Sequence, residues 1–309
     1  MIRTSHYLFA ALCLGSLFAC SRQFTDSYIV PKWCFAVFML FIVLAYEAVN
    51  ILFYRQNEQK DTRISVYGFI IVISCFLQAM FGVVQFFGFF QISTTLWVTG
   101  SFDNPAGFAA CLCAGFPFVG FLLSDSNKYI RYVGGLIGFV IVIAVILSQS
   151  RAGIMSIAFI CFILLNMKFF HKRWVKYLSL LCFALLLSGC YWMKKDSADG
   201  RLLIWRCSVS MVKDAPWLGH GIGSFEARYM DYQADYFRQY GLNRYSMLAD
   251  NVKHPFNEYL GVLLNFGFVG LLMILALITL LIYCYKKHPC AEKRIAFYSL
   301  ISIGVFSFF

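Results

Sequence analysis

Long uninterrupted apolar stretches, separated by short polar segments, make up most of this chain. Eight of them are bounded by charged or polar residues, and a ninth begins near Ile295 and continues to Phe309. The eight stretches cover residues 7–20, 33–53, 64–90, 105–123, 129–148, 153–167, 174–193 and 256–284. A helix that crosses a hydrocarbon layer about 30 Å thick needs roughly 20 apolar residues, and several stretches reach this length. The pattern therefore predicts a polytopic membrane protein.

Helices are the spanning elements that this pattern favours. The stretches are too long and too continuously apolar for the alternating strands of a membrane barrel, and a backbone inside lipid must satisfy its own hydrogen bonds. We therefore predict an all-α fold, a polytopic transmembrane helical bundle. The ninth stretch ends at Phe309 after about fifteen residues, short of the roughly 20 needed, so we also expect that the chain stops before the fold does.

One long polar segment, residues 194–255, interrupts the apolar pattern. We predict three parts: residues 1–193 with transmembrane helices 1 to 7, the large loop 194–255, and residues 256–309 with helix 8 and an incomplete helix 9. With a cytoplasmic N-terminus, fourteen Lys and Arg residues fall in the inner loops, and the short outer loops hold only Arg22, Lys32 and Arg151. Because cytoplasmic loops are rich in Lys and Arg, this count predicts that the large loop lies outside the cytoplasm.

The composition supports a membrane protein and narrows the expected partners. Hydrophobic residues make up 61% and charged residues 13% of the chain, whereas soluble domains have about 45 to 50% and about 25%. The net charge of +11 comes largely from the inner loops, so we expect no nucleic-acid partner. Nearly all of the twelve cysteines lie in apolar stretches, and no Cys or His spacing suits a structural zinc site. We therefore expect neither a metal nor a cofactor.

The large loop contains signals for two helices and a glycine-rich turn. Asp199 and Gly200 predict a turn, and the apolar positions that follow predict a short helix that Pro216 ends. Ser224 is suited to cap a second helix.

The sequence WLGHGIGSF, residues 217–225, lies between these helices. Its alternating glycines predict a tight turn, and we expect the backbone amides of Gly221 and Gly223 to approach an anionic group.

The second helix of the loop carries one aromatic face. Its members fall at helical spacing, and they are Phe225, Tyr229, Tyr232, Tyr236 and Tyr240. One interpretation is that this face packs on the membrane surface or on the helical bundle. The other is that one or two of its rings, with Tyr229 as our candidate, line a sugar-binding cleft, since a flat apolar ring with a polar edge suits a pyranose.

Three basic side chains are expected at the same face of the membrane. Arg151 lies in the short turn SQSRAG, Arg201 opens the large loop, and His254 precedes Pro255 at the rim of the eighth stretch. Arginines at such a rim are either interface anchors or ligands of an anionic substrate.

Four stretches, taken together, resemble the O-antigen ligase-like superfamily, which also contains O-antigen polymerases and bacterial protein O-oligosaccharyltransferases. They are GSFDNPAGFAACL (100–112), LSQSRAG (147–153), GRLLIW with DAPWLGHGIGSF (200–205 and 214–225), and NEYLGVLLNFGFVGLL (257–272). Their order and spacing, together with the large outer loop, carry the resemblance.

The resemblance implies a C-type glycosyltransferase-like fold with one large periplasmic loop, in the inner membrane of a bacterium. It implies metal-independent transfer of a glycan from an undecaprenyl-pyrophosphate carrier to an acceptor at the periplasmic face. The acceptor is lipid A core for a ligase, which is the activity we favour, a growing glycan for a polymerase, or a protein.

The resemblance also implies roles for individual residues. Arg151 and Arg201 match arginines that engage the pyrophosphate, and Asn257 matches the Asn of a motif written HN-x-YL. In this chain Phe256 stands where that motif has His, and His254 is the nearest histidine. Asn265 also replaces a usual Glu.

We therefore expect Arg201 and His254 to be catalytic, because arginine forks suit phosphate oxygens and imidazole suits general base chemistry. The expected substrate-binding residues are Arg151, Gly221, Gly223, Tyr229 and Asn257. The competing class is a transporter or flippase. Glu47 is the one acidic residue deep in an apolar stretch, and one such residue is little for a proton pathway.

Overall fold

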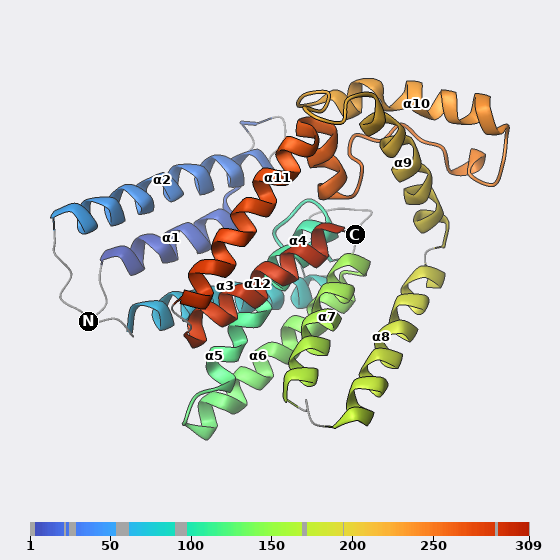
Figure 1. Ribbon diagram of the computed structural model, residues 1–309. Coiled ribbons are helices and arrows are strands. Elements are labelled where there is room, and N and C mark those ends of the chain that lie inside the picture. Colours follow the sequence, from blue (N-terminus) through green and yellow to red (C-terminus); the bar gives the residue numbers. More distant parts are fainter. Residues whose placement is uncertain are drawn as a thin grey trace. The chain divides into compact units, whose positions relative to one another are not determined.

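The computed structural model describes residues 4–21, 23–24, 29–53, 62–89, 98–168, 172–193, 195–287 and 290–308. These residues form helices joined by turns and loops, without a β-strand among them (Figure 1). Arg22 and the ends of two predicted spans, residues 90 and 309, lie outside the described residues.

Helical segments lie in each of the nine predicted stretches, and the stretch 105–123 is divided into two helices and a 3-10 turn. The N-terminal part contains α1 (Thr4–Phe18), α2 (Ile29–Phe53), α3 (Thr62–Phe86), α4 (Pro105–Gly115), the 3-10 turn η1 (Phe116–Phe118), α5 (Val119–Leu123), α6 (Lys128–Leu147) and α7 (Arg151–Lys168). The chain continues with α8 (Arg173–Met193), α9 (Lys195–Asp214), α10 (Ser224–Tyr240), the 3-10 turn η2 (Ser246–Leu248), α11 (Glu258–Lys287) and α12 (Ala291–Phe308).

The structure confirms a polytopic helical membrane protein. Among the described residues, five helices are long and apolar enough to cross a membrane, and they are Ile29–Asn50, Val66–Phe86, Pro105–Leu123, Lys128–Leu147 and Glu258–Lys287. Two shorter apolar helices are Thr4–Phe18 and Arg151–Met167.

The chain divides into two compact units, which we describe separately. The first contains Met1–Ile160 and Cys290–Phe306, and the second contains Cys161–Pro289 and Ser307–Phe309.

In the first unit, two buried glutamines of α3 hold the loop that leads into α4. The side-chain oxygen of Gln85 accepts hydrogen bonds from the amides of Thr99 and Gly100, both at 2.9 Å. The amide of Gln78 donates to Ser101 at 3.0 Å. Because buried polar groups need partners, these bonds fix the backbone of the GSFDNPAGF segment.

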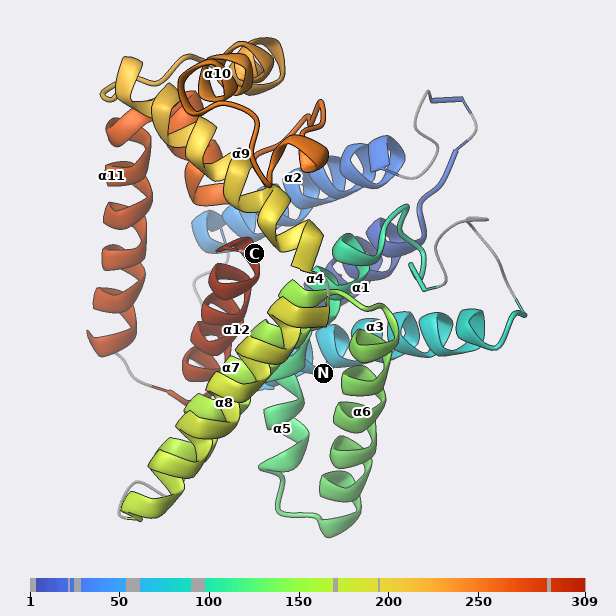
Figure 2. The same ribbon diagram turned by 90° about the vertical axis from the view of Figure 1, so that its right-hand side faces the viewer.

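In the second unit, α9, α10 and the first turns of α11 pack together (Figures 1 and 2). Apolar residues at helical spacing on α9 form its core with residues from the other two helices and the following loop. The buried members are Leu203, Ile204, Cys207, Met211, Phe225, Tyr229, Tyr245 and Leu264.

Two local predictions for the large loop were wrong. Asp199 and Gly200 do not form a turn but lie inside α9, which starts at Lys195. Asp199 is buried and accepts a hydrogen bond from the hydroxyl of Tyr191 at 3.1 Å, a tertiary contact that outweighs the weak helix propensity of these two residues. Ser224 is the first residue of α10 rather than its cap, and Gly223 is the N-cap.

Candidate functional site

The segment that carries His254 is held against the helix that carries Arg201. Arg201 and Trp205 lie four residues apart on α9, so they share one helical face. The indole nitrogen of Trp205 donates to the carbonyl of Pro255 at 3.0 Å. The guanidinium of Arg201 lies 5.3 Å from the centre of the Phe256 ring. These contacts hold Pro255 and Phe256, which follow His254, against the part of α9 that carries Arg201.

Phe256 and Asn257 form the joint between this segment and α11. Phe256 has a φ of 52°, in the left-handed region that costs energy for a bulky residue. Asn257 is buried, and its side-chain oxygen accepts a hydrogen bond from the amide of Leu260 at 3.0 Å, which caps α11. Its side-chain nitrogen donates to the carbonyl of Phe308 at 3.1 Å. Asn257 therefore positions the start of α11, whereas His254 is exposed.

The glycine-rich turn docks into a break in α11. The break lies at Gly267, which has a φ of 61° and a ψ of −158°. The amides of His220 and Gly221 donate to the carbonyls of Leu264 and Asn265, at 2.7 and 3.1 Å. In return, the amides of Phe268 and Val269 donate to Pro216 and Trp217, at 2.8 and 3.2 Å. Our expectation that the amide of Gly221 faces an anion is therefore not met, because α11 already occupies this donor.

The same turn requires glycine for steric reasons. A Cβ on Gly219 would lie 2.6 Å from the carbonyl carbon of Asn265, and a Cβ on Gly267 would lie 2.3 Å from the carbonyl oxygen of Trp217. Gly223 has a φ of 79°, and its carbonyl accepts a hydrogen bond from the amide of Ala227 at 3.4 Å. It therefore turns the chain into α10. The predicted tight turn is thus present, and its glycines allow two backbones to approach closely.

The predicted aromatic face divides into a buried half and an accessible half. Phe225 and Tyr229 stack at 4.9 Å in the core, and the hydroxyl of Tyr229 accepts a hydrogen bond from Gln233 at 2.8 Å. Tyr229 has no exposed surface, and burial raises the pKa of its hydroxyl to about 12. This end of the face is a packing surface, so Tyr229 does not offer its ring to a sugar.

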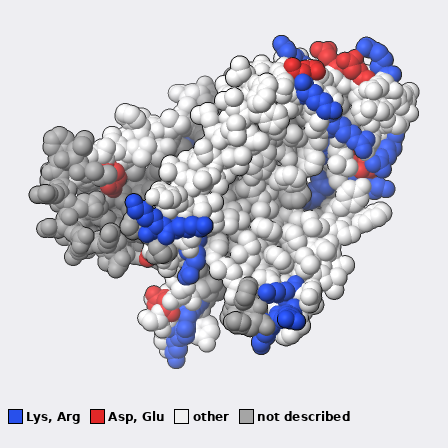
Figure 3. All heavy atoms as spheres, viewed as in Figure 1, with Lys and Arg blue, Asp and Glu red and all other residues white. Residues whose placement is uncertain are grey.

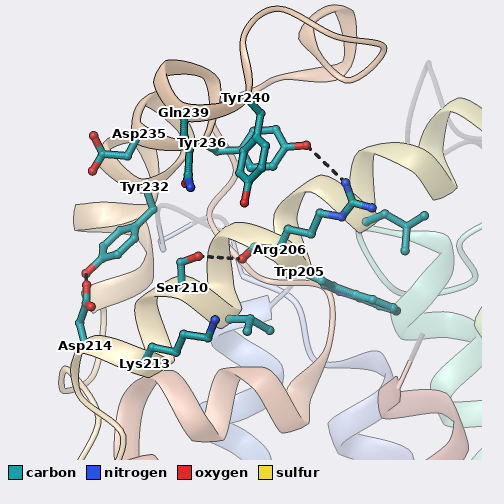
Figure 4. Close-up of a pocket in the computed structure, with 12 residues that line it drawn as sticks. Trp205, Arg206, Ser210, Lys213, Asp214, Tyr232, Asp235, Tyr236, Gln239 and Tyr240 are labelled. Atoms are coloured by element: carbon teal, nitrogen blue, oxygen red, sulfur yellow. Dashed lines mark hydrogen bonds between the residues drawn. The ribbon is translucent and has the colours of Figure 1, made fainter.

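The accessible half lines a cleft of about 800 Å³ between α9 and α10 (Figure 4). Tyr232, Tyr236 and Tyr240 contribute their rings from α10, and Trp205 and Arg206 approach from α9. The remaining lining residues are Leu202, Val209, Ser210, Lys213, Asp214, Asp235 and Gln239. Sequence reasoning identified the aromatic face but did not pair it with α9, because a helical pattern does not show which neighbour lies opposite.

Two hydrogen bonds between α9 and α10 hold side chains of this cleft in place. Arg206 donates to the hydroxyl of Tyr236 at 3.3 Å, and its guanidinium lies 5.1 Å from the centre of the Tyr245 ring. The hydroxyl of Tyr232 donates to Asp214 at 2.6 Å, and this bond to a carboxylate raises the pKa of Tyr232 to about 12. The cleft therefore presents a tyrosine hydroxyl that is bonded to the side chain of Asp214.

Arg151 belongs to the first unit, where it opens α7 after a short turn. Ser150 caps the helix, since its hydroxyl accepts the amide of Gly153 at 3.3 Å. Gly153 is tightly packed, because an added Cβ would lie 2.8 Å from Ala109. A cation in the first turn of a helix opposes the helix dipole, whereas the same position favours a bound anion.

Charged side chains are unevenly distributed over the second unit. In Figure 3 they gather over α9 and α10, and the surface over the middle of α11 is uncharged. Within the described parts of the chain, no group of three or more His, Cys, Asp or Glu side chains could hold a metal ion. The fold and site thus define an integral membrane protein with a polar helical module that holds Arg201, His254 and an aromatic cleft.

Comparison with known proteins finds one family model that matches part of the chain. Residues 135–275 match the family model described as O-antigen ligase, which confirms the resemblance to the O-antigen ligase-like superfamily over these residues. The match includes Arg151, Arg201, the glycine-rich turn and the segment from His254 to Asn257. It implies, in general terms, transfer of lipid-linked glycans. No curated protein and no solved structure matches the chain.

Proposed function

We propose that this chain moves a glycan from an undecaprenyl-pyrophosphate carrier to an acceptor at the periplasmic face of the bacterial inner membrane. We further propose that it is an O-antigen ligase, with lipid A core as the acceptor. The observation that carries this proposal is the family match over the residues that place Arg201 beside the His254 segment.

Arg201 supports the departure of the carrier. Breaking the bond between the anomeric carbon and the pyrophosphate oxygen leaves the electron pair, and therefore negative charge, on the leaving undecaprenyl pyrophosphate. A guanidinium binds phosphate oxygens through parallel N–H groups and gains strength where water is partly excluded. Arg201 is half-buried, and its contact with the Phe256 ring orients the guanidinium plane.

His254 is the proposed general base. As the acceptor oxygen attacks the anomeric carbon, its proton passes to the imidazole, and the products are the glycan–acceptor conjugate and undecaprenyl pyrophosphate. The exposed position of His254 gives a large acceptor access to the ring. In this arrangement Phe256, which replaces the family histidine, orients Arg201, and the base is supplied from two residues earlier.

The other candidate residues have supporting roles in this proposal. Arg151 binds the pyrophosphate together with the N-terminus of α7, since both favour an anion. Asn257 and Gly223 position the segments around the site through the hydrogen bonds described above. The polyprenyl tail lies against membrane helices.

Polymerase and protein O-oligosaccharyltransferase activities use the same donor and differ in the acceptor. A deletion strain distinguishes the three, because loss of a ligase leaves long polymer on its carrier. Loss of a polymerase leaves single repeats on the lipid A core, and loss of a protein transferase leaves lipopolysaccharide unchanged. Complementation with the wild-type chain should restore the profile, and Arg201→Ala at equal membrane abundance should not. If Arg201→Ala restores it fully, the proposed mechanism is wrong.

A further inference from the structure

The cleft between α9 and α10 has the chemistry of a carbohydrate site. Its volume of about 800 Å³ lies within the range of roughly 300 to 1,000 Å³ that is usual for small-molecule sites. Tyr232, Tyr236 and Tyr240 line it from α10 and Trp205 lines it from α9, and Tyr240 is 61% exposed. Flat aromatic faces with polar edges suit the C–H faces and hydroxyls of a pyranose.

The polar residues of the cleft favour a neutral sugar over a phosphate. The cations Arg206 and Lys213 are balanced by the carboxylates Asp214 and Asp235, so the lining has no formal net charge. Gln239 and Ser210 add groups that both donate and accept hydrogen bonds. Such alternating donors and acceptors match sugar hydroxyls, whereas a pyrophosphate would need an excess of positive charge.

The cleft continues from the proposed reaction centre along α9. Trp205 contributes to both, because its indole nitrogen bonds to Pro255 and the residue is among those that line the cleft. From Arg201 to Lys213 the helix rises about 18 Å, which is enough for a short oligosaccharide. A glycan held at its carrier end beside Arg201 could therefore extend over Trp205 and onto the tyrosines of α10.

We infer that the α9–α10 cleft binds neutral sugar residues of the transferred glycan, beyond the sugar that is linked to pyrophosphate. This inference rests on the proposed function. It assigns Tyr236, Tyr240 and Arg206 to glycan recognition, and it leaves bond breaking to the Arg201 end of α9.

Binding to the purified full-length protein in nanodiscs tests the inference. The probe is the oligosaccharide released by mild acid from the lipid-linked glycans of the strain that carries this chain, followed by saturation-transfer NMR and titration. Tyr240→Ala should weaken binding about 2- to 10-fold, the usual contribution of one aromatic contact. Tyr240→Phe, which keeps the ring, should bind nearly as the wild type does. Met230→Ala, an exposed position of α10 outside the cleft, is the matched control and should have no effect.

The outcomes separate this inference from the proposed function. Arg201→Ala should lose transfer and still bind the released glycan. If the wild type transfers glycan but Tyr240→Ala and Tyr236→Ala both bind like the wild type, the cleft is not a glycan site and the transferase proposal stands. If the glycan binds in a Tyr240-dependent way but no transfer occurs, the proposed function fails and the site remains. Absence of binding to the wild type overturns the inference.

A second inference concerns the glycine-rich turn and rests on separate observations. Three large apolar side chains of this turn are exposed: Trp217 by 69%, Leu218 by 75% and Ile222 by 83%. Their backbone is fixed to α11 around Gly267 by the four hydrogen bonds described above, and the Trp217 ring lies 6.0 Å from that of Phe268. Exposed apolar groups on so rigid a turn require a partner surface.

The length of α11 identifies that surface. The helix has 30 residues with the break at Gly267, and it ends with Lys286 and Lys287. Roughly 20 residues cross the hydrocarbon layer, so counting back from these lysines puts its other boundary close to Gly267. Tryptophan is enriched at this depth in membrane proteins. We infer that Trp217, Leu218 and Ile222 insert into the lipid at the membrane boundary beside α11.

Tryptophan fluorescence in proteoliposomes tests this depth. The difference in emission between the wild type and Trp217→Phe isolates Trp217 from the other five tryptophans, and phenylalanine keeps the ring contact with Phe268. Lipids brominated near the headgroup should quench this difference strongly, and aqueous iodide only weakly. Quenching by iodide, without quenching by brominated lipid, would show that the turn lies in water.

Discussion

A substitution at Gly267 tests whether the hydrogen-bonded contact between the glycine-rich turn and α11 requires glycine at the break in this helix. At φ 61° and ψ −158° its backbone occupies a region that is essentially restricted to glycine, and another residue there costs about 1 to 3 kcal/mol. The Cβ of Gly267→Ala would also lie 2.3 Å from the carbonyl oxygen of Trp217, so the turn must move. Loss of two of the four backbone hydrogen bonds adds about 1 to 3 kcal/mol. We expect destabilisation by about 2 to 6 kcal/mol in total.

Gly261→Ala is the matched control for this substitution. Gly261 lies in the same helix with ordinary dihedrals, and its added Cβ would meet Pro255 at 3.7 Å, which is normal van der Waals contact. Alanine should stabilise the helix there by about 0.5 to 1 kcal/mol. Thermal unfolding in detergent, followed by intrinsic fluorescence, should show a Tm about 4 to 12 °C lower for Gly267→Ala, at about 2 °C per kcal/mol, and an unchanged or slightly higher Tm for Gly261→Ala. Equal Tm values would refute the argument that the break in α11 requires glycine.

Four further predictions concern the reaction and the topology. Arg201→Lys keeps the charge but loses the guanidinium fork, so kcat for transfer should fall about 10²- to 10³-fold in membranes with equal amounts of protein. Arg151→Ala should raise KM for the lipid-linked donor, and an unchanged KM would remove it from the carrier site. His254→Ala should lower kcat, whereas an unchanged kcat would assign the base elsewhere. A cysteine introduced at position 230 should react with an impermeant thiol reagent from outside the cell and one at position 172 should not; the reverse would overturn the topology.

The helical membrane architecture was predictable from the sequence because a long, continuously apolar stretch that crosses lipid must form a helix. A backbone inside hydrocarbon must satisfy its own hydrogen bonds, so apolar runs such as residues 129–148 specify helices without reference to their neighbours. The structure accordingly has α6 over Lys128–Leu147 and a turn before Arg151. The motifs around Arg201 and Asn257 were also visible in the sequence, and both lie within residues 135–275, which match the O-antigen ligase family model.

The tertiary structure alone decided which chemical groups of the large loop stay accessible. Tyr229 and Tyr240 share one helical face in the sequence, but α9 and α11 bury only the first, which leaves the second to line a cleft. The amide of Gly221 belongs to a glycine turn that suits an anion, yet α11 bonds to it from 44 residues further along the chain. Periodicity specifies the apolar face of a helix and glycine specifies a permitted turn. Which part of that face is covered, and which donor is already occupied, depends on contacts between residues far apart in the chain, and local pattern contains no information about them.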